Sequence, residues 1–287
     1  MKRIKYLIQF ICIISLLSIF KLLGLKYSSI LSGNILKFFG PILRSNKIVF
    51  SNLQIAYPNI NEDQRKIILK KMWINYGRML AEYMFIKNYR TDEKYKNKIL
   101  IENQNIIENI KKENDRVIFI SGHFNNFELM AMQIEKLGVN LAALYRPLNN
   151  FFLNPIMENI RKKYICKKQI KKGISGLKEL LINYKKGSSI ALMIDQRVSQ
   201  GIRSNLFNKK ALTTTIPAQF VKKFNTKIVP VYIERGKNNN FRIKFFEPLE
   251  FKNESSIEDI TLELNKVLEE MINKNPDQWI WTHDRWK

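Results

Sequence analysis

Residues 116–138 read RVIFISGHFNNFELMAMQIEKLG. The apolar, β-branched run 116–120 predicts a buried strand, and residues 127–137 predict a helix that ends at the C-cap residue Gly138. The octapeptide between them is therefore a strand-to-helix turn, and it carries His123 and Glu128. In an open α/β sheet, ligands bind beyond the carboxyl ends of the strands. This turn is consequently the first candidate for a site of chemistry.

The rest of the chain alternates between strand-like and helix-like segments, which implies a mostly parallel sheet flanked by helices. We expect further strands at residues 139–145, 189–194, 227–232 and 241–246. We expect further helices at residues 155–164, 174–184, 215–224 and 257–273. No linker rich in Pro, Gly or Ser divides the chain, so the prediction is a single α/β domain over residues 27–287.

Residues 1–26 are predicted to form a membrane anchor helix in front of that domain. The segment from Tyr6 to Leu25 contains one charged residue, Lys21, and a helix of this length spans about 30 Å, the thickness of a bilayer core. A cleaved signal peptide also begins with basic residues, but bulky and basic residues follow here instead of a small-residue cleavage site. We therefore favour an uncleaved anchor. Because Lys21 interrupts the apolar run, the helix could span the bilayer or be monotopic, and basic residues on both sides suit a helix that lies in, or dips into, the cytoplasmic leaflet.

The chain carries 49 basic and 25 acidic residues, a formal net charge of +24. Such an excess predicts a polyanionic partner, which could be a nucleic acid, an anionic membrane surface or an acidic protein. A composition rich in Ile, Lys and Asn is an alternative source of much of the charge. The two cysteines, Cys12 and Cys166, provide neither a disulfide framework nor a zinc-binding spacing.

Three other segments have local signals. Residues 52–58 favour turns closed by a proline, and Asn61 predicts the N-cap of a helix with a capping box. Within that helix, Arg78 and Glu82 are four residues apart and can pair on the surface. The basic run 167–173 is expected to be a solvated loop.

His123 is the first candidate for catalysis, because an imidazole titrates near neutrality and can take a proton from a hydroxyl. Glu128 could bond the second ring nitrogen and hold the tautomer, as the acid of a Ser-His-Asp triad does. No Gly-x-Ser-x-Gly motif supplies a protein nucleophile, so the attacking hydroxyl would belong to the substrate. The alternatives are a hydrogen-bonded structural histidine and, less favoured by the spacing, a metal ligand.

Polar residues also follow two other predicted strands. Arg146 and Asn149 come after one of them, Asp195 comes after another, and Arg161 lies on a neighbouring predicted helix. Guanidinium groups suit a phosphate, a carboxylate or a developing oxyanion. Because the carboxyl ends of parallel strands meet at one edge of a sheet, these residues are expected near His123.

The C-terminal segment 279–287 holds three of the four tryptophans together with basic residues. This composition suits a membrane interface or a packed, interlocked tail. It would also suit single-stranded nucleic acid. No nucleic-acid-binding motif accompanies it, so no nucleic acid partner is expected.

The chain resembles the lipid A biosynthesis lauroyl/myristoyl acyltransferases, the late acyltransferases of lipopolysaccharide assembly. The resemblance runs through almost the whole chain and includes the N-terminal hydrophobic helix. Its motifs are Asn52-Leu53 to Tyr57-Pro58, Trp73 to Glu82, Ser121-Gly122-His123 to Glu128, Tyr145-Arg146-Pro147 with Asn149, Asp195-Gln196, Ala211 with Thr213, and Trp281-x-His283-x-Arg285-Trp286-Lys287. The spacing His-x-x-x-x-Glu is weak by itself, since glycerolipid acyltransferases use a similar His-x-x-x-x-Asp, but the ordered set is specific.

The resemblance implies a glycerolipid-acyltransferase-like fold. It also implies transfer of a fatty acyl chain from acyl carrier protein to a hydroxyl on an acyl chain of the Kdo-bearing lipid A precursor, with no cofactor or metal. The catalytic domain would lie on the cytoplasmic face of the bacterial inner membrane. A basic surface would attract the acidic carrier, the phosphorylated lipid and the anionic membrane.

The resemblance assigns catalysis to the pair His123 and Glu128. Substrate contacts are expected from the residues at the other strand ends and the neighbouring helix, namely Arg146, Asn149, Arg161 and Asp195. A glycerolipid or another glycolipid is the alternative acceptor. A non-catalytic, membrane-anchored binder of anionic polymers would explain the charge but not the placement of His123 and Glu128.

The turn departs from the family pattern at its centre. The usual Gly-Asn-Trp-Glu is replaced by Asn125-Asn126-Phe127-Glu128. Asparagine tolerates a left-handed backbone better than most residues, so Asn125 can preserve the turn. The change is expected to affect acyl-chain or acceptor preference more than the chemistry.

Overall fold

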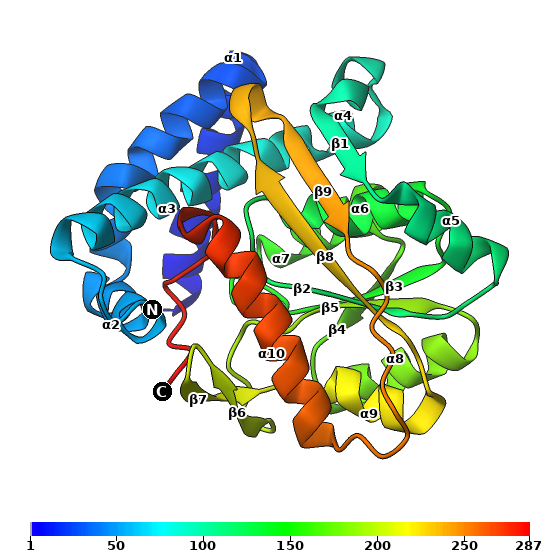
Figure 1. The fold of residues 1–287 in the computed structure, drawn as a ribbon. Helices are drawn as coiled ribbons and strands as arrows, with labels where there is room; N and C mark the ends of the chain where they lie inside the picture. Colours follow the sequence, from blue (N-terminus) through cyan, green and yellow to red (C-terminus); the bar gives the residue numbers. More distant parts are fainter. Residues whose placement is uncertain (1) are drawn as a thin grey trace.

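A seven-stranded sheet forms the centre of the molecule in a computed structural model that describes residues 2–287 (Figure 1). The strand order is β1-β9-β8-β2-β5-β3-β4, and every neighbouring pair is parallel except β8 and β9. A separate antiparallel hairpin joins β6 and β7. The strands are β1 Ile99–Glu102, β2 Ile118–Ser121, β3 Leu141–Tyr145, β4 Lys168–Lys171, β5 Ser189–Met193, β6 Ile202–Leu206, β7 Lys209–Thr213, β8 Ile228–Arg235 and β9 Phe241–Phe245.

Helices cover both faces of this sheet, with α10 across the near face in Figure 1 and α6 behind it. All four residues of the central strand β2 are buried, which explains its continuous apolar sequence. The helices are α1 Lys2–Leu43, α2 Asn46–Ala56, α3 Glu62–Glu82, α4 Ile86–Thr91, α5 Gln104–Lys112, α6 Glu128–Lys136, α7 Asn154–Ile160, α8 Ile174–Lys185, α9 Ile216–Phe224 and α10 Ile257–Lys274.

The predicted α/β class with a mostly parallel sheet is confirmed, and each expected strand is present as β2, β3, β5, β8 or β9. The basic run 167–173, in contrast, is not a loop, because most of it forms the edge strand β4 beside β3. Only Ile170 of this strand is buried, and both of its lysines are exposed. An edge strand can carry charged side chains outward, so its composition resembled that of a loop.

The segment before α3 differs from its prediction. Residues 46–56 form α2 after the N-cap Ser45, so the segment 52–58, where turns were expected, is helical as far as Ala56. The turn at Pro58 follows only after this helix ends. The predicted capping box of α3 is confirmed, because the Asn61 side chain accepts from the Gln64 N–H and the Gln64 side chain accepts from the Asn61 N–H.

Helix α1 is long and apolar enough to cross a membrane by length and composition. It breaks at Gly24, where φ is 72°, a backbone conformation that glycine adopts without steric cost. The part after Gly24 packs closely on α3, and a Cβ added to Gly77 would lie 2.3 Å from the carbonyl oxygen of Ser32. The predicted anchor boundary at residue 26 thus falls inside α1, two residues after its break.

Candidate functional site

Parallel pairing of β2 with β5 brings His123 and Asp195 together. Ser121 pairs with Met193 in the register of these strands. His123 follows Ser121 by two positions, and Asp195 follows Met193 by two positions. The Nδ1 atom of His123 lies 2.7 Å from Oδ1 of Asp195, and the backbone N–H of His123 donates to Oδ2 at 2.7 Å. A carboxylate from the neighbouring strand end therefore sets the orientation of the imidazole.

This arrangement corrects the expectation that Glu128 bonds the ring of His123, and it gives Asp195, which was expected among the substrate contacts, a bond to that ring. Asp195 is 3% exposed, and its carboxylate also accepts a hydrogen bond from the indole N–H of Trp279 at 2.8 Å. With its oxygens engaged inside the protein, Asp195 is a partner of the histidine. The physical reason is the strand order, since β5 is a direct neighbour of β2 and its end places Asp195 beside His123.

The electrostatics of this pair favour a protonated Nδ1. Burial by itself would lower the pKa of His123, but the charge and hydrogen bond of Asp195 outweigh it and raise that pKa above its ordinary value. Burial would likewise raise the pKa of Asp195, but the adjacent imidazole lowers it to about 2. Nε2 lies 3.4 Å from Nε2 of Gln196. In the neutral imidazole with its proton on Nδ1, this second nitrogen carries the lone pair.

Glu128 begins α6 and forms a second charged pair at the other end of the turn. Its Oε1 accepts from Nε and Nη2 of Arg161 at 2.8 and 2.6 Å, and from the hydroxyl of Tyr83 at 2.9 Å. Burial would lower the pKa of Arg161, but the charge of Glu128 raises it above its ordinary value. Burial raises the pKa of Tyr83, which keeps the phenol a hydrogen-bond donor. Sequence reasoning missed Tyr83, which no motif distinguished.

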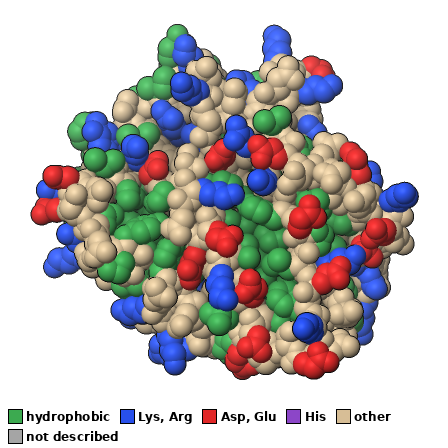
Figure 2. Space-filling view, viewed as in Figure 1, with side chains coloured by type: hydrophobic (Ala, Val, Ile, Leu, Met, Phe, Trp, Pro, Cys, Tyr) green, Lys and Arg blue, Asp and Glu red, His purple; other side chains and the backbone are tan. Residues whose placement is uncertain are grey.

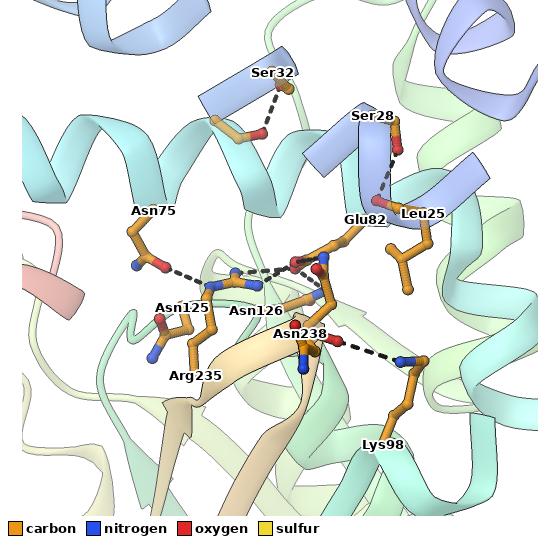
Figure 3. A network of polar contacts seen from close by, with 12 residues as sticks. Leu25, Ser28, Ser32, Asn75, Glu82, Lys98, Asn125, Asn126, Arg235 and Asn238 are labelled. Carbon is orange, nitrogen blue, oxygen red and sulfur yellow. Dashed lines mark hydrogen bonds and ion pairs between the residues drawn. The ribbon is translucent and has the colours of Figure 1, made fainter. Parts of the chain in front are cut away.

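A buried ion pair between Glu82 and Arg235 supports the middle of the turn (Figure 3). Both guanidinium Nη atoms bond the carboxylate of Glu82, which is fully buried, and Nε of Arg235 donates to Asn75 at 2.8 Å. Asn126 in the turn donates its Nδ2 to Oε2 of Glu82 at 3.3 Å. The predicted surface pairing of Glu82 with Arg78 is therefore wrong, because Glu82 points into the interior and meets Arg235 of β8.

Asn125 has a left-handed backbone, with φ of 44°, as predicted for the position that replaces glycine. Its backbone N–H donates to the carbonyl of Gln278 at 3.1 Å, and its Nδ2 donates to Oε1 of Gln278 at 2.6 Å and to the carbonyl of Ile233 at 3.1 Å. Phe127 packs edge-on against the ring of His123, with 4.7 Å between ring centroids. The turn is thus held from the sheet and from the C-terminal segment.

The C-terminal segment is a packed tail, which was one of its two predicted forms. Trp279 and Trp281 are buried and pack edge to face, and the Arg285 side chain is buried with them. His283 Nε2 accepts a hydrogen bond from the backbone N–H of Arg197 at 2.8 Å, directly after the Asp195-Gln196 pair. Composition alone indicated packing here, but it could not show that Trp279 contacts the site.

An apolar cavity of about 70 Å³ adjoins the Glu128–Arg161 pair. It lies between α6 and the sheet. Its lining includes Phe119, Met130, Ala131, Ile134, Ala143 and Leu192. Because the charged pair borders a mostly apolar space, the site can hold a polar reacting group beside a hydrocarbon chain.

The structure brings four of the six predicted site residues together. His123 contacts Asp195, Glu128 contacts Arg161, and the charges of Glu128 and Arg161 act on the pKa of His123. The other two, Arg146 and Asn149, are exposed on the loop after β3, at the same carboxyl edge of the sheet. Within residues 2–287, no group of three or more His, Cys, Asp or Glu side chains is placed to bind a metal ion.

A family model described as bacterial lipid A biosynthesis acyltransferase matches residues 1–287. The chain belongs to this family. The acyltransferase is 22% identical over 242 residues to the lipid A biosynthesis myristoyltransferase of Escherichia coli (strain K12), an alignment that covers 83% of this chain and 73% of that protein. It is 23% identical over 257 residues to the lipid A biosynthesis lauroyltransferase of the same organism, covering 85% and 79%.

A third relative is the lipid A biosynthesis palmitoleoyltransferase of Escherichia coli (strain K12), which is 20% identical over 248 residues, covering 85% of this chain and 79% of that protein. The three names share lipid A biosynthesis and differ in the acyl group. The chain therefore belongs to the acyltransferases of lipid A biosynthesis, and its similarity to the three relatives does not distinguish the acyl group.

Proposed function

We propose that this acyltransferase moves a fatty acyl chain from the thioester of acyl carrier protein to a hydroxyl on an acyl chain of the Kdo-bearing lipid A precursor. The observation that carries the proposal is the His123–Asp195 pair at the carboxyl edge of the sheet, where Nε2 is the nitrogen left for a substrate proton. A hydroxyl acceptor needs such a base, because its own pKa is far above neutrality.

The reaction proceeds by attack of the acceptor hydroxyl on the thioester carbonyl. Nε2 of His123 takes the hydroxyl proton as the new C–O bond forms, and Asp195 stabilises the imidazolium through Nδ1–H. Collapse of the tetrahedral intermediate breaks the C–S bond, and the carrier thiolate takes the proton back from Nε2. Asp195 acts here as a positioning residue, since it reaches the reacting atoms only through the imidazole.

Glu128 supports this chemistry from the N-terminus of α6. The backbone N–H groups of a helix N-terminus stabilise developing negative charge, as on the thioester oxygen. The Glu128–Arg161 contacts fix the first turn of α6 against the residue that follows α7. Glu128 thereby keeps the start of the helix and the adjoining His123 in a fixed geometry.

The apolar cavity beside Glu128 and Arg161 is proposed to receive the donor acyl chain. Ala131 of α6, Ala143 of β3 and Ala191 of β5 are its smallest lining side chains. An Ala143→Leu substitution would reduce the space and shift the preferred donor to a shorter chain. The measurement is product mass with a mixed pool of acyl carrier protein donors, and an unchanged chain-length distribution would contradict the assignment.

The charge and the N-terminal helix support a location on the cytoplasmic face of the inner membrane. Figure 2 shows Lys and Arg side chains mainly around the outline of one face, with Asp and Glu side chains interspersed among apolar ones across its middle and lower part. The whole chain has a net charge of +24, so the protein attracts an acidic carrier protein and an anionic membrane together. Helix α1 would provide the hydrophobic attachment.

The test is acyl transfer by the purified full-length protein with acyl carrier protein donors. The lipid A precursor and a glycerolipid are offered as competing acceptors, and the masses of the products are measured. We expect a mass gain on the precursor, and its loss in a His123→Ala variant that remains folded. Transfer to the glycerolipid alone would favour the alternative acceptor, and full turnover by His123→Ala would contradict the catalytic assignment.

A further inference from the structure

The loop after β3 lies against the N-terminal part of α1. Asn150 donates its Nδ2 to the carbonyl oxygen of Tyr6 at 2.9 Å. The rings of Tyr6 and Phe151 pack edge-on with 5.7 Å between centroids, and those of Phe10 and Phe152 lie 5.8 Å apart. These contacts join the anchor helix to the loop that begins with the exposed Arg146.

Helix α1 is held along the domain over most of the segment before its break. Tyr6 contacts the loop near one end, and Phe20 near the other end is 1% exposed. These two residues are about 21 Å apart along a helix. Only one stripe of the segment is covered in this way, because most of its other apolar side chains are exposed. A membrane that receives the uncovered faces of α1 therefore also meets the loop beside it.

The loop itself presents apolar side chains to the outside. Phe151 is 49% exposed, although its ring contacts Tyr6, and Leu148 is exposed two residues after Arg146. Exposed apolar side chains therefore stand on both elements, and the Tyr6–Phe151 contact joins the two elements into one apolar surface region. These side chains are Ile4, Leu7, Ile8 and Ile11 on α1 and Leu148 and Phe151 on the loop.

Basic groups border this surface. Lys2, Arg3 and Lys5 are exposed at the start of α1, directly before Tyr6, and Arg146 is exposed at the start of the loop. Cationic side chains beside an exposed apolar surface suit an anionic bilayer, in which headgroups meet the charges and acyl chains meet the apolar residues. The contact of the loop with α1 and the basic residues at the border both indicate that an anionic bilayer covers this surface.

We propose that residues 148–152 form a second membrane-contacting element, which inserts Leu148 and Phe151 into the interface of an anionic bilayer beside α1. The inference rests on the proposed membrane attachment through α1. Arg146 and Asn149 then lie where the bilayer surface meets the carboxyl edge of the sheet. A lipid acceptor reaches His123 from the bilayer at this loop, without first leaving the membrane for water.

The experiment places an environment-sensitive bimane label on the full-length protein. In a Cys12→Ser background the remaining Cys166 is buried, so a label on Phe151→Cys reports the loop alone. The protein is bound to vesicles of phosphatidylethanolamine with a minority of phosphatidylglycerol. We expect a blue-shifted emission and quenching by spin-labelled lipid, similar to a label on the native Cys12 of α1.

The matched control is Ile182→Cys on α8, in the same Cys12→Ser background. The exposed fraction of Ile182, 52%, is similar to that of Phe151. Ile182 lies near the end of α8 that leads to the start of β5, at the opposite edge of the sheet. Its label should remain accessible to aqueous iodide and insensitive to the lipid quencher. If the Phe151→Cys label behaves like this control while Cys12 is quenched by lipid, the loop proposal is overturned. This readout does not involve catalysis, so it is separate from any failure of the proposed reaction.

A second measurement compares Phe151→Asp with Phe151→Leu. Aspartate should weaken vesicle binding several-fold and raise KM for an acceptor embedded in vesicles, whereas leucine should keep both near the parent values. Neither variant should change kcat with an acceptor dispersed in detergent. Equal vesicle binding and equal KM for the two variants would contradict insertion of the loop.

Discussion

Two charged pairs hold the ends of one turn, and they differ in kind. His123 and Asp195 meet between the ends of parallel strands, whereas Glu128 and Arg161 meet between helical segments. In the first pair, a group that titrates near neutrality faces a carboxylate whose pKa is lowered to about 2. In the second, a guanidinium that is always charged holds a carboxylate. This difference is why we propose proton transfer for the first pair and fixed geometry for the second.

Asp195→Asn should have the largest effect, because it removes the charge that orients and stabilises the imidazolium. We expect kcat to fall by roughly 10²–10⁴-fold. The pKa of His123 is raised by Asp195 against the opposing effect of burial. Without the carboxylate that pKa falls, so the acid limb of kcat/KM should move to lower pH. The measurement is a pH profile of acyl transfer, and an unmoved limb with near-normal kcat would assign orientation of the ring to another residue.

Glu82→Gln tests the support beneath both pairs. The substitution leaves the buried guanidinium of Arg235 without its counter-charge, which should cost about 3–5 kcal/mol of unfolding free energy. Urea unfolding measures the loss. The control is Glu102→Gln, which breaks a more exposed pair with Arg242 at 3.2 Å and should cost less than about 1 kcal/mol. Equal losses in the two variants would mean that burial adds nothing at Glu82.

Arg161→Lys tests the second pair directly. Lysine keeps the positive charge but cannot reproduce the two hydrogen bonds that Nε and Nη2 both donate to Oε1 of Glu128. We expect roughly a tenfold loss of kcat, equivalent to about 1.4 kcal/mol. The acid limb of the pH profile should stay in place, since the charge near His123 is retained. A shift of that limb as large as the shift in Asp195→Asn would remove the distinction between the pairs.

Tyr83→Phe should have the smallest effect. It deletes one hydrogen bond to Glu128, at 2.9 Å, and leaves both bonds from Arg161. A loss of about 0.5–1 kcal/mol corresponds to roughly a two- to fivefold decrease in kcat, measured at saturating donor. A loss as large as that of Arg161→Lys would make the phenol an equal partner in holding Glu128.

Local sequence signals predicted the elements around the turn well. The apolar run before His123 and the helix after it depend on neighbouring residues only, and both are present. The left-handed backbone at Asn125 is also present, as expected from the glycine that the family pattern has at this position. Edge strand β4 was missed because its lysines face solvent, and α2 was missed because turn residues outweighed its helical pattern. The position of Glu82 was missed because helical spacing shows which residues share a face, but not which face is buried.

By itself, the sequence determined the class of fold, the apolar N-terminal helix and the set of polar residues at the carboxyl edge of the sheet. These features follow from hydrophobic periodicity, capping and strand-end chemistry, which act over a few residues. Only the tertiary structure decided which residue contacts His123. Asp195 is 72 residues away along the chain, and the order of the strands, set by burial of the whole sheet, makes it a neighbour in place of Glu128. The same packing released Glu128 to Arg161 and brought the loop at Phe151 to the anchor helix.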